Sequence, residues 1–294
     1  MITSCEGNTM KETNPFWARL TKPIRDSVIN NIIESMPVNK LAPWDKEFTF
    51  AERLLPKNAL LSKFPQWVSS HFTGFDKLPF RYVCNGNTDS LNHIFMQGKF
   101  DRVFTLDNEY TYYGHLCQEL GKEKIIFNLD NIEQITSRDL VCISVPNAFN
   151  GSVNDRIDII NILQKNNIPV YIDVAYCGLT DPFLVNIQPT SNTYFAFSFS
   201  KTLALGFNRI SVLYSGTAIP GLDIMNKIGY INISGVNIVN ALIKQLPCDY
   251  IYKTYKDQYL PICNRLGLTP TSTILVAHDA AKQKYCITDE YNIL

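Results

Sequence analysis

The chain has 294 residues, of which 46% are hydrophobic, so it is long enough to bury a large core. Its 27 basic and 27 acidic side chains cancel and form no run of like charge, which excludes a nucleic-acid-binding or anionic-membrane-binding surface from our expectations. No apolar stretch is long enough for a membrane span, and the first fifteen residues lack a signal-peptide core. We therefore expect a cytoplasmic protein with a small-molecule ligand.

The eight cysteines are scattered and include no C-x-x-C pair or Cys/His cluster with zinc-site spacing. The histidines likewise show no pattern that indicates a partner. We expect reduced thiols, structural histidines and no metal site. The cysteines are Cys5, Cys84, Cys117, Cys142, Cys177, Cys248, Cys263 and Cys286, and the histidines are His71, His93, His115 and His278.

Helical periodicity over Ile24–Met36 predicts a helix near the start of the chain, followed by Pro37 and Pro43 as helix breakers. We expect residues 1–44 to form an N-terminal arm and part of a smaller subdomain.

Seven short β-branched or aromatic runs alternate with helical patterns across the middle of the chain. Such alternation predicts an α/β fold with a mostly parallel sheet sandwiched by helices, which we assign to a large domain of residues 45–247. The runs are Phe80–Val83, Arg102–Leu106, Lys124–Phe127, Leu140–Val145, Val170–Val174, Tyr194–Phe197 and Ile210–Tyr214.

The C-terminal part contains a predicted helix, Tyr250–Leu266, and a strand-like run, Thr273–Ala277. We expect residues 248–294 to pack with the N-terminal arm as a small α+β subdomain.

Chemically versatile residues follow several of the predicted strands. In a parallel sheet, ligands bind beyond the carboxyl ends of the strands, so these residues are expected to gather at one edge. They are Gly86, Tyr110, Asn147, Asp173 and the segment Ser198–Lys201.

Lys201 lies in a Ser/Thr-rich segment, where a single lysine is usually just solvated. Its neighbours change that interpretation. The hydroxyls of Ser198 and Ser200, with the guanidinium of Arg209 eight residues after the lysine, form a set suited to a phosphate group. The charge of Arg209 is also expected to lower the lysine pKa and favour a nucleophilic amine.

Asp173 ends an apolar run, and a carboxylate buried there requires a cationic partner. The alternative is a strand-end aspartate that caps a turn. Tyr176 lies on the same short loop and is within reach of the same ligand; taken alone it is a packing aromatic. Pyridoxal 5′-phosphate meets all of these requirements. Its aldehyde forms a Schiff base with an amine, its ring nitrogen pairs with an acid, and its phenolate oxygen and phosphate accept hydrogen bonds.

Gly86, Asn87 and Thr88 follow the first predicted strand and open a helix, so their backbone N–H groups predict an anion site. The alternative is an ordinary capped helix. Tyr110 is placed to stack on the pyridine ring, and Asn147 to direct an amide at the phenolate oxygen. The competing interpretations are a core aromatic and a simple Asn turn. Dinucleotide and P-loop fingerprints are absent.

Taken together, these motifs resemble the class I/II aminotransferase branch of fold type I pyridoxal-phosphate-dependent enzymes, over roughly residues 80–215. The motifs are Gly86-x-Thr88-x-Ser90-Leu91, Tyr110-x-x-Tyr113, Asn147–Gly151, Asp173-x-x-Tyr176 and Ser198-x-Ser200-Lys201 with Arg209.

The resemblance implies a role for each residue. Lys201 would be the Schiff-base lysine and proton shuttle, Asp173 the partner of the ring nitrogen, and Tyr176 a donor to the phenolate oxygen. The phosphate would be held by Asn87, Thr88, Ser198 and Arg209, and Tyr110 would stack on the ring. A homodimer and a small amino substrate are also implied.

The sequence departs from the family in two places. Ala148 stands where the family's loop carries a cofactor-contacting asparagine, so Asn147 or Asn150 would have to replace it. The C-terminal part is short, and after Arg209 it contains one arginine, Arg265, within a predicted helix. The usual clamp for a substrate carboxylate is therefore missing.

Transamination is the leading hypothesis. Lyase, decarboxylase or cyclase chemistry and a non-catalytic relative of the fold stay open.

Overall fold

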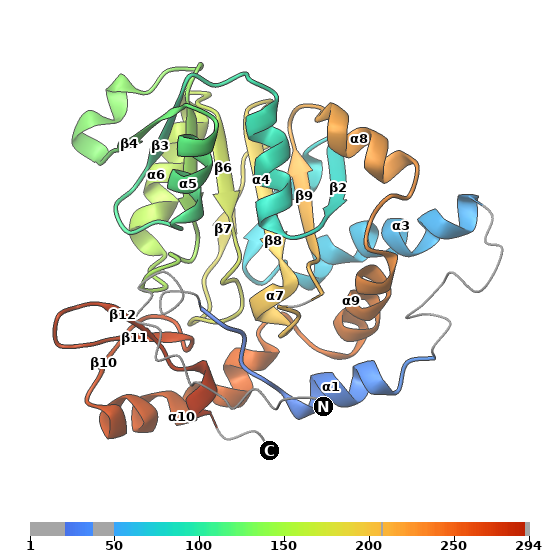
Figure 1. The fold of residues 1–294 in the computed structure, drawn as a ribbon, viewed down its shortest axis with the longest axis vertical. Coiled ribbons are helices and arrows are strands. Elements are labelled where there is room, and N and C mark those ends of the chain that lie inside the picture. Colours follow the sequence, from blue (N-terminus) through green and yellow to red (C-terminus); the bar gives the residue numbers. More distant parts are fainter. Residues whose placement is uncertain (1–20, 38–49, 207, 292–294) are drawn as a thin grey trace, which may run out of the picture.

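The structure, a computed structural model, describes residues 21–37, 50–206 and 208–291. A seven-stranded sheet forms its centre, with the strand order β2-β9-β8-β6-β5-β3-β4 (Figure 1). The strands are β2 (Phe80–Cys84), β3 (Arg102–Thr105), β4 (Glu123–Ile126), β5 (Leu140–Ser144), β6 (Val170–Asp173), β8 (Thr193–Ser198) and β9 (Ser211–Ser215). Each corresponds to one of the seven predicted runs.

The sheet is mostly parallel, as predicted. The pairs β6/β8, β5/β6, β3/β5 and β3/β4 are parallel, and β9 runs antiparallel to β2 and β8. In register, Asp173 lies beside Ala196 and Ser144 beside Asp173. The carboxyl ends of β5, β6 and β8 therefore lie side by side.

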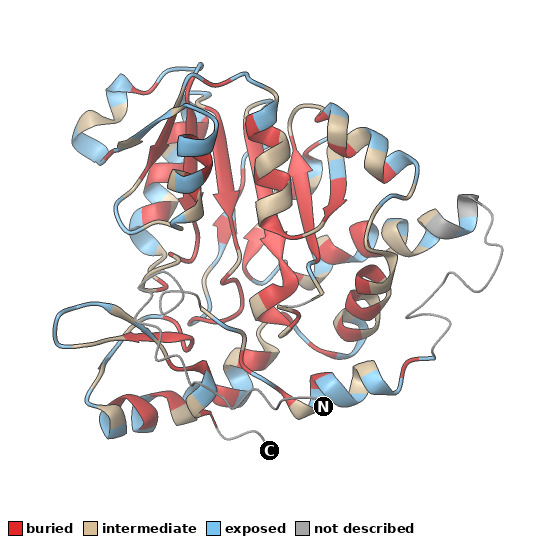
Figure 2. Ribbon diagram, in the orientation of Figure 1, coloured by how far each residue is buried: buried red, intermediate tan, exposed pale blue. Residues whose placement is uncertain are grey.

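Helices cover both faces of the sheet. One face packs against α4 (Asn87–Met96), α5 (Tyr112–Glu119) and α8 (Pro220–Lys227), and the other against α3 (Phe50–Trp67) and α6 (Asn154–Lys165). The strands other than the edge strand β4 are buried throughout most of their length, whereas the helices keep an exposed outer side (Figure 2). Alternate side chains along these six strands enter the two separate apolar layers, as the two-residue period of a strand requires.

The chain flanks contribute α1 (Ser27–Glu34), α9 (Ile233–Gln245) and α10 (Tyr250–Leu266), and a small antiparallel sheet of β10 (Thr269–Pro270), β11 (Val276–His278) and β12 (Lys284–Cys286). A two-stranded parallel sheet joins β1 (Phe72–Thr73) to β7 (Val185–Asn186). The short α7 (Phe199–Thr202) follows β8, and 3-10 turns lie at Phe75–Lys77, Leu129–Gln134 and Thr288–Glu290.

The predicted helix Tyr250–Leu266 is confirmed to the residue. The first helix is shorter than predicted, because the Asp26 side chain accepts from the Ile29 N–H and fixes the start. The predicted strand Thr273–Ala277 starts only at Val276. Thr273, the first residue of the predicted strand, instead donates its hydroxyl to the Leu179 carbonyl at 3.0 Å.

The two flanks contact each other. The buried Asp26 carboxylate accepts from the Tyr255 hydroxyl at 2.9 Å, and Lys22 pairs with Asp289 at 2.7 Å. The division at residues 44 and 247 stays a prediction. The boundary at residue 44 lies outside the described residues, as do Cys5 and Pro43. Within the described ranges, no helix combines the length and apolar character needed to cross a bilayer.

Candidate active site

The carboxyl ends of β6 and β8 are joined by the side chain of Asn87, the first residue of α4. Its Nδ2 donates to Asp173 Oδ1 at 2.7 Å and to the Ala196 carbonyl at 3.2 Å. The sequence predicted a backbone role for Asn87 but not this side-chain contact. The start of α4 is thereby fixed against the strand ends that carry Asp173 and Ser198.

Asp173 is buried and surrounded by neutral donors. Besides Asn87, the Ala175 N–H donates to Oδ1 at 3.1 Å and the Tyr113 hydroxyl to Oδ2 at 3.3 Å. Burial raises the pKa of Asp173 to about 6, and these hydrogen bonds oppose the shift. Across the described ranges, no cationic side chain forms a salt bridge with this carboxylate. Its environment therefore favours the approach of a positively charged group.

Lys201 lies in the single turn α7, which begins with Ser198 as its N-cap. Its ammonium donates to the carbonyl of Thr21, in the segment that precedes α1. Burial lowers the pKa of Lys201 to about 8, and the charge of Arg209 lowers it further. The predicted effect of Arg209 has the right sign, but burial is the larger cause. With this pKa, roughly a tenth of the amine is uncharged at pH 7, and the share rises steeply above it.

Tyr176 is buried beside a second lysine that the sequence pattern did not reveal. The Tyr176 hydroxyl donates to Thr21 Oγ1 at 2.6 Å, so Thr21 contacts both Tyr176 and Lys201. Lys284, in β12, donates to the Tyr176 hydroxyl at 3.2 Å and to the Ala148 carbonyl at 2.6 Å. Burial lowers the pKa of Lys284 to about 8, and the charge of Lys201 lowers it further.

The start of α4 lies against the guanidinium of Arg209. Gly86 has φ 94°, in the region that favours glycine, and any Cβ there would overlap the Arg209 guanidinium. Arg209 Nη2 donates to Thr88 Oγ1 at 3.4 Å. Among the described residues Arg209 forms no salt bridge, and it is exposed. A guanidinium beside a helix N-terminus is suited to an anion such as phosphate.

Tyr110 lies between Asp173 on one side and the Thr88 and Arg209 side chains on the other. Burial and the charge of Asp173 raise its pKa, whereas a hydrogen bond with Thr88 and the charge of Arg209 lower it. Its ring meets Tyr113 edge to face, with 5.6 Å between centroids. The phenol therefore lies within electrostatic reach of both the acidic and the cationic groups.

A buried ion pair supports the loop that carries Tyr110. Glu109 pairs with Arg156, and the backbone N–H of Ser144, at the end of β5, donates to Glu109 at 3.1 Å. Burial raises the pKa of Glu109, and the Arg156 charge opposes that shift. This support was not visible in the sequence, because its members come from three separate elements.

Asn147 and the two serines mainly bond to their own neighbours. Asn147 Oδ1 accepts from the Phe149 and Asn150 N–H groups at 2.9 and 3.0 Å, which is the simple-turn alternative. Its amide nitrogen is 3.5 Å from the Asn108 carbonyl. The Ser198 hydroxyl donates to that of Ser200 at 3.0 Å. Ligand contacts by these three residues stay predictions.

No protein-family model and no curated protein sequence matches the chain. Solved structures do. An aspartate aminotransferase from Thermotoga maritima is similar with a TM-score of 0.66 and 16% identity, covering 87% of this chain and 76% of that one. A PLP-bound C-S lyase from Staphylococcus hominis is similar with a TM-score of 0.65 and 12% identity, and the match covers 94% of this chain and 81% of that one. An aromatic aminotransferase from Pyrococcus horikoshii is similar with a TM-score of 0.65 and 14% identity, and the match covers 88% of this chain and 78% of that one.

The likeness extends over most of the chain and matches the resemblance that the motifs indicated. The chain therefore has the aminotransferase-like fold of the fold type I pyridoxal-phosphate-dependent enzymes.

Proposed function

We propose that this protein is a pyridoxal-phosphate-dependent enzyme that transfers an amino group between an amino acid or amine and a 2-oxo acid or aldehyde. One observation carries the proposal. Asp173, a buried carboxylate that has no ion pair among the described residues, ends β6. Lys201, whose pKa is lowered to about 8, follows the adjacent strand β8 at the same edge of the sheet.

The groups at this edge fit the cofactor. Among the described residues, Asp173 has no ion pair with the kind of cation that a protonated pyridine nitrogen would provide, and Asn87 Oδ1 is buried without a hydrogen-bond partner. At the other end, Gly86 leaves room that a side chain would fill, so that Arg209 can lie against the start of α4. The donor set thus offers an acid for the ring, and for the phosphate a guanidinium beside a helix N-terminus.

Each residue has a separate task in this proposal. Arg209, Thr88 and the free N–H groups at the start of α4 would hold the phosphate, and Asp173 would keep the ring nitrogen protonated. Tyr176 would donate to the phenolate oxygen, and Tyr110 would lie against the ring. When bound, the cofactor supplies an electron sink for the pair released at the substrate Cα. Lys201 would hold the cofactor through its amine and would move the Cα proton, because a pKa near 8 lets it take up and release a proton near neutral pH.

Lys284 is our candidate for holding an acidic group of the substrate. Arg265, the remaining arginine of the C-terminal part, forms an exposed ion pair with Glu290 at 2.9 Å. Lys284 is half-buried, contacts Tyr176 and lies within electrostatic reach of Lys201. A carboxylate beside Lys284 would restore its positive charge, which burial disfavours.

Lyase chemistry on an amino acid is the second candidate, since the same electron sink serves elimination. The likeness to the C-S lyase, which covers 94% of this chain, supports it. Amino donors distinguish the two. With the cofactor-loaded protein and a panel of amino acids, transamination yields a 2-oxo acid and leaves the cofactor in its amine form, one equivalent for each site. A lyase releases ammonia or carbon dioxide continuously and leaves the cofactor form unchanged.

A non-catalytic relative would show neither result and would stay colourless when the cofactor is added. We also propose a homodimer, as the resemblance implies. Analytical ultracentrifugation of the cofactor-loaded protein tests this, and a purely monomeric species across the micromolar range would contradict it.

A further inference from the structure

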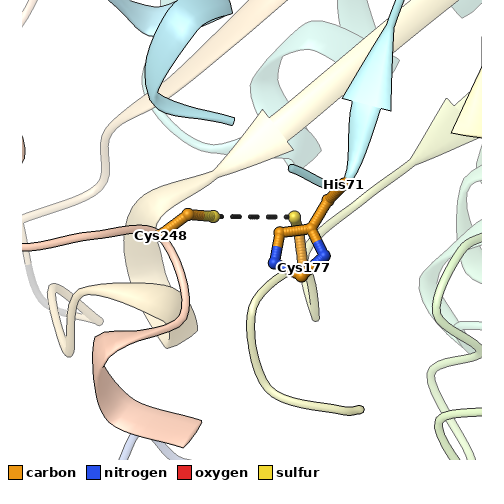
Figure 3. Close-up of side chains that lie close together, drawn as sticks. All are labelled: His71, Cys177 and Cys248. Atoms are coloured by element: carbon orange, nitrogen blue, oxygen red, sulfur yellow. Dashed lines mark hydrogen bonds between the residues drawn. The ribbon is translucent and has the colours of Figure 1, made fainter. Parts of the chain in front are cut away.

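A second group of reactive side chains is buried, and one of its members, Cys177, directly follows Tyr176 in the chain. His71 lies between α3 and β1, Cys177 in the loop after β6, and Cys248 just before α10 (Figure 3). Their exposed fractions are 1%, 0% and 2%. The three segments are distant in sequence, so the spacing of the cysteines and histidines did not predict this group.

The atoms of this Cys/His group lie at metal-binding separations. The two sulfurs are 3.7 Å apart, and one ligand atom from each residue lies within 4.8 Å of the others. Two thiolates bound tetrahedrally to zinc at about 2.3 Å have sulfurs about 3.8 Å apart. The observed separation is therefore close to that of a zinc site, and far longer than the roughly 2.05 Å of a disulfide bond.

The imidazole of His71 gives an independent indication. Among the described residues, neither ring nitrogen has a hydrogen bond of good geometry, although the backbone of Phe183 is close enough for a weak interaction. A buried unsatisfied donor or acceptor typically costs about 1–3 kcal/mol. Metal coordination would use one nitrogen and remove part of this cost. In Figure 3 the ring lies directly beside the two sulfurs.

We propose that His71, Cys177 and Cys248 bind one thiophilic divalent cation of the zinc type. On binding, the two thiols release two protons, and two S–M bonds and one N–M bond form. Two thiolates, a neutral imidazole and a divalent ion sum to zero charge, which suits a buried position. The carboxylate of Asp249 acts electrostatically on both His71 and Cys177, so it also favours a cation nearby.

Such an ion would join the loop of Asp173 and Tyr176 to the start of α10. Cys177 directly follows Tyr176, and the next residue, Gly178, packs so tightly against the Cys248 carbonyl that any Cβ would overlap it. Structural zinc sites stabilise the fold that presents their ligands. Zinc would thus fix the strand-end loop against the C-terminal part.

The test uses the full-length protein, with zinc itself as the probe. After incubation with zinc and removal of excess ion, we expect one zinc per chain. X-ray absorption should show a mixed sulfur and nitrogen shell, with Zn–S near about 2.3 Å and Zn–N near about 2.0–2.1 Å. A shell of nitrogen and oxygen alone, or a stoichiometry well below one, would overturn the proposal. A Cys177–Cys248 disulfide in a peptide map of the freshly purified protein would overturn it too.

Variants separate binding from folding. Cys248→Ser should weaken zinc binding, measured by competition with a chromophoric chelator, by more than about 100-fold, which exceeds the usual effect of an outer-sphere partner. Cys263→Ser, which alters an equally buried thiol on α10, should bind zinc like the wild type. His71→Phe removes the unsatisfied nitrogens, so we expect it to fold without metal and to lose the rise in Tm that zinc gives the wild type. Equal zinc binding by Cys248→Ser and Cys263→Ser would contradict the assignment.

Discussion

The strand-edge residues and the Cys/His group are both buried and polar, but they differ in how their polar atoms are satisfied. At the strand edge nearly every polar group has a protein partner, yet Asp173 and Lys201 have shifted pKa values because burial disfavours their charges. In the Cys/His group the two thiols bond to each other, and within the described ranges His71 has no hydrogen bond of good geometry. This difference is why we propose different ligands for the two places: a charged organic cofactor at the strand edge and a metal ion in the Cys/His group.

The largest expected effect comes from breaking the hydrogen-bonded support of the strand edge. Glu109→Gln removes the charge that pairs with Arg156 and leaves that guanidinium buried and unpaired. Loss of one partner of a buried pair typically costs about 3–5 kcal/mol of unfolding free energy. Urea denaturation measures this change.

Glu290→Gln is the matched control, because its partner Arg265 is largely exposed. We expect a loss below about 1 kcal/mol. Equal losses in the two variants would show that the edge does not depend on its buried ion pair.

Asp173→Asn tests the charge at the edge. The amide keeps the shape of the carboxylate but cannot hold a proton on the ring nitrogen, so we expect kcat/KM for amino transfer to fall on the order of 10²–10³-fold. Steady-state kinetics measure this loss. An unchanged rate would remove Asp173 from the proposed site.

The same variant should stabilise the cofactor-free protein at neutral pH. The folded pKa of Asp173, about 6, lies above the ordinary value of 3.8, so its stabilising contribution is fully present below about pH 4 and is lost as the pH rises through 6. The difference corresponds to about 2–3 kcal/mol at pH 7. Thermal melts should show the gain of Asp173→Asn shrinking as the pH falls from about 7 to about 4.

Gly86→Ala tests the contact between Arg209 and the start of α4. The new methyl group would overlap the Arg209 guanidinium, so we expect cofactor affinity to fall by about 10–100-fold, as for a strain of about 1–3 kcal/mol. Gly121→Ala also places alanine at positive φ, here 62°, but meets no neighbouring atom. Gly121→Ala should lose stability without losing affinity for the cofactor. Titration of both apoproteins with pyridoxal 5′-phosphate measures the difference.

The sequence predicted the sheet well because each strand is a local pattern. All seven apolar runs became strands, and the parallel pairing brought Asp173 and the Lys201 segment to one edge, as the strand-end principle requires. The turn role of Asn147 was available as an alternative, since Asn favours such turns.

Long-range partners could not be predicted in this way. Thr21 and Lys284 reach Tyr176 from opposite ends of the chain, and the Cys/His group combines three distant segments. These contacts depend on how the flanks fold back on the sheet, which no local spacing encodes. The same limit hid the pairing of Glu109 with Arg156.

The most direct test of the proposed function is covalent attachment of the cofactor. After the protein is mixed with pyridoxal 5′-phosphate and reduced with borohydride, peptide mass spectrometry should place a single stable adduct on Lys201. With a pKa of about 8, attachment should speed up about tenfold between pH 7 and 9 and then level off. Lys201→Ala should carry no such adduct. An adduct confined to surface lysines, or one equally abundant in Lys201→Ala, would contradict the account.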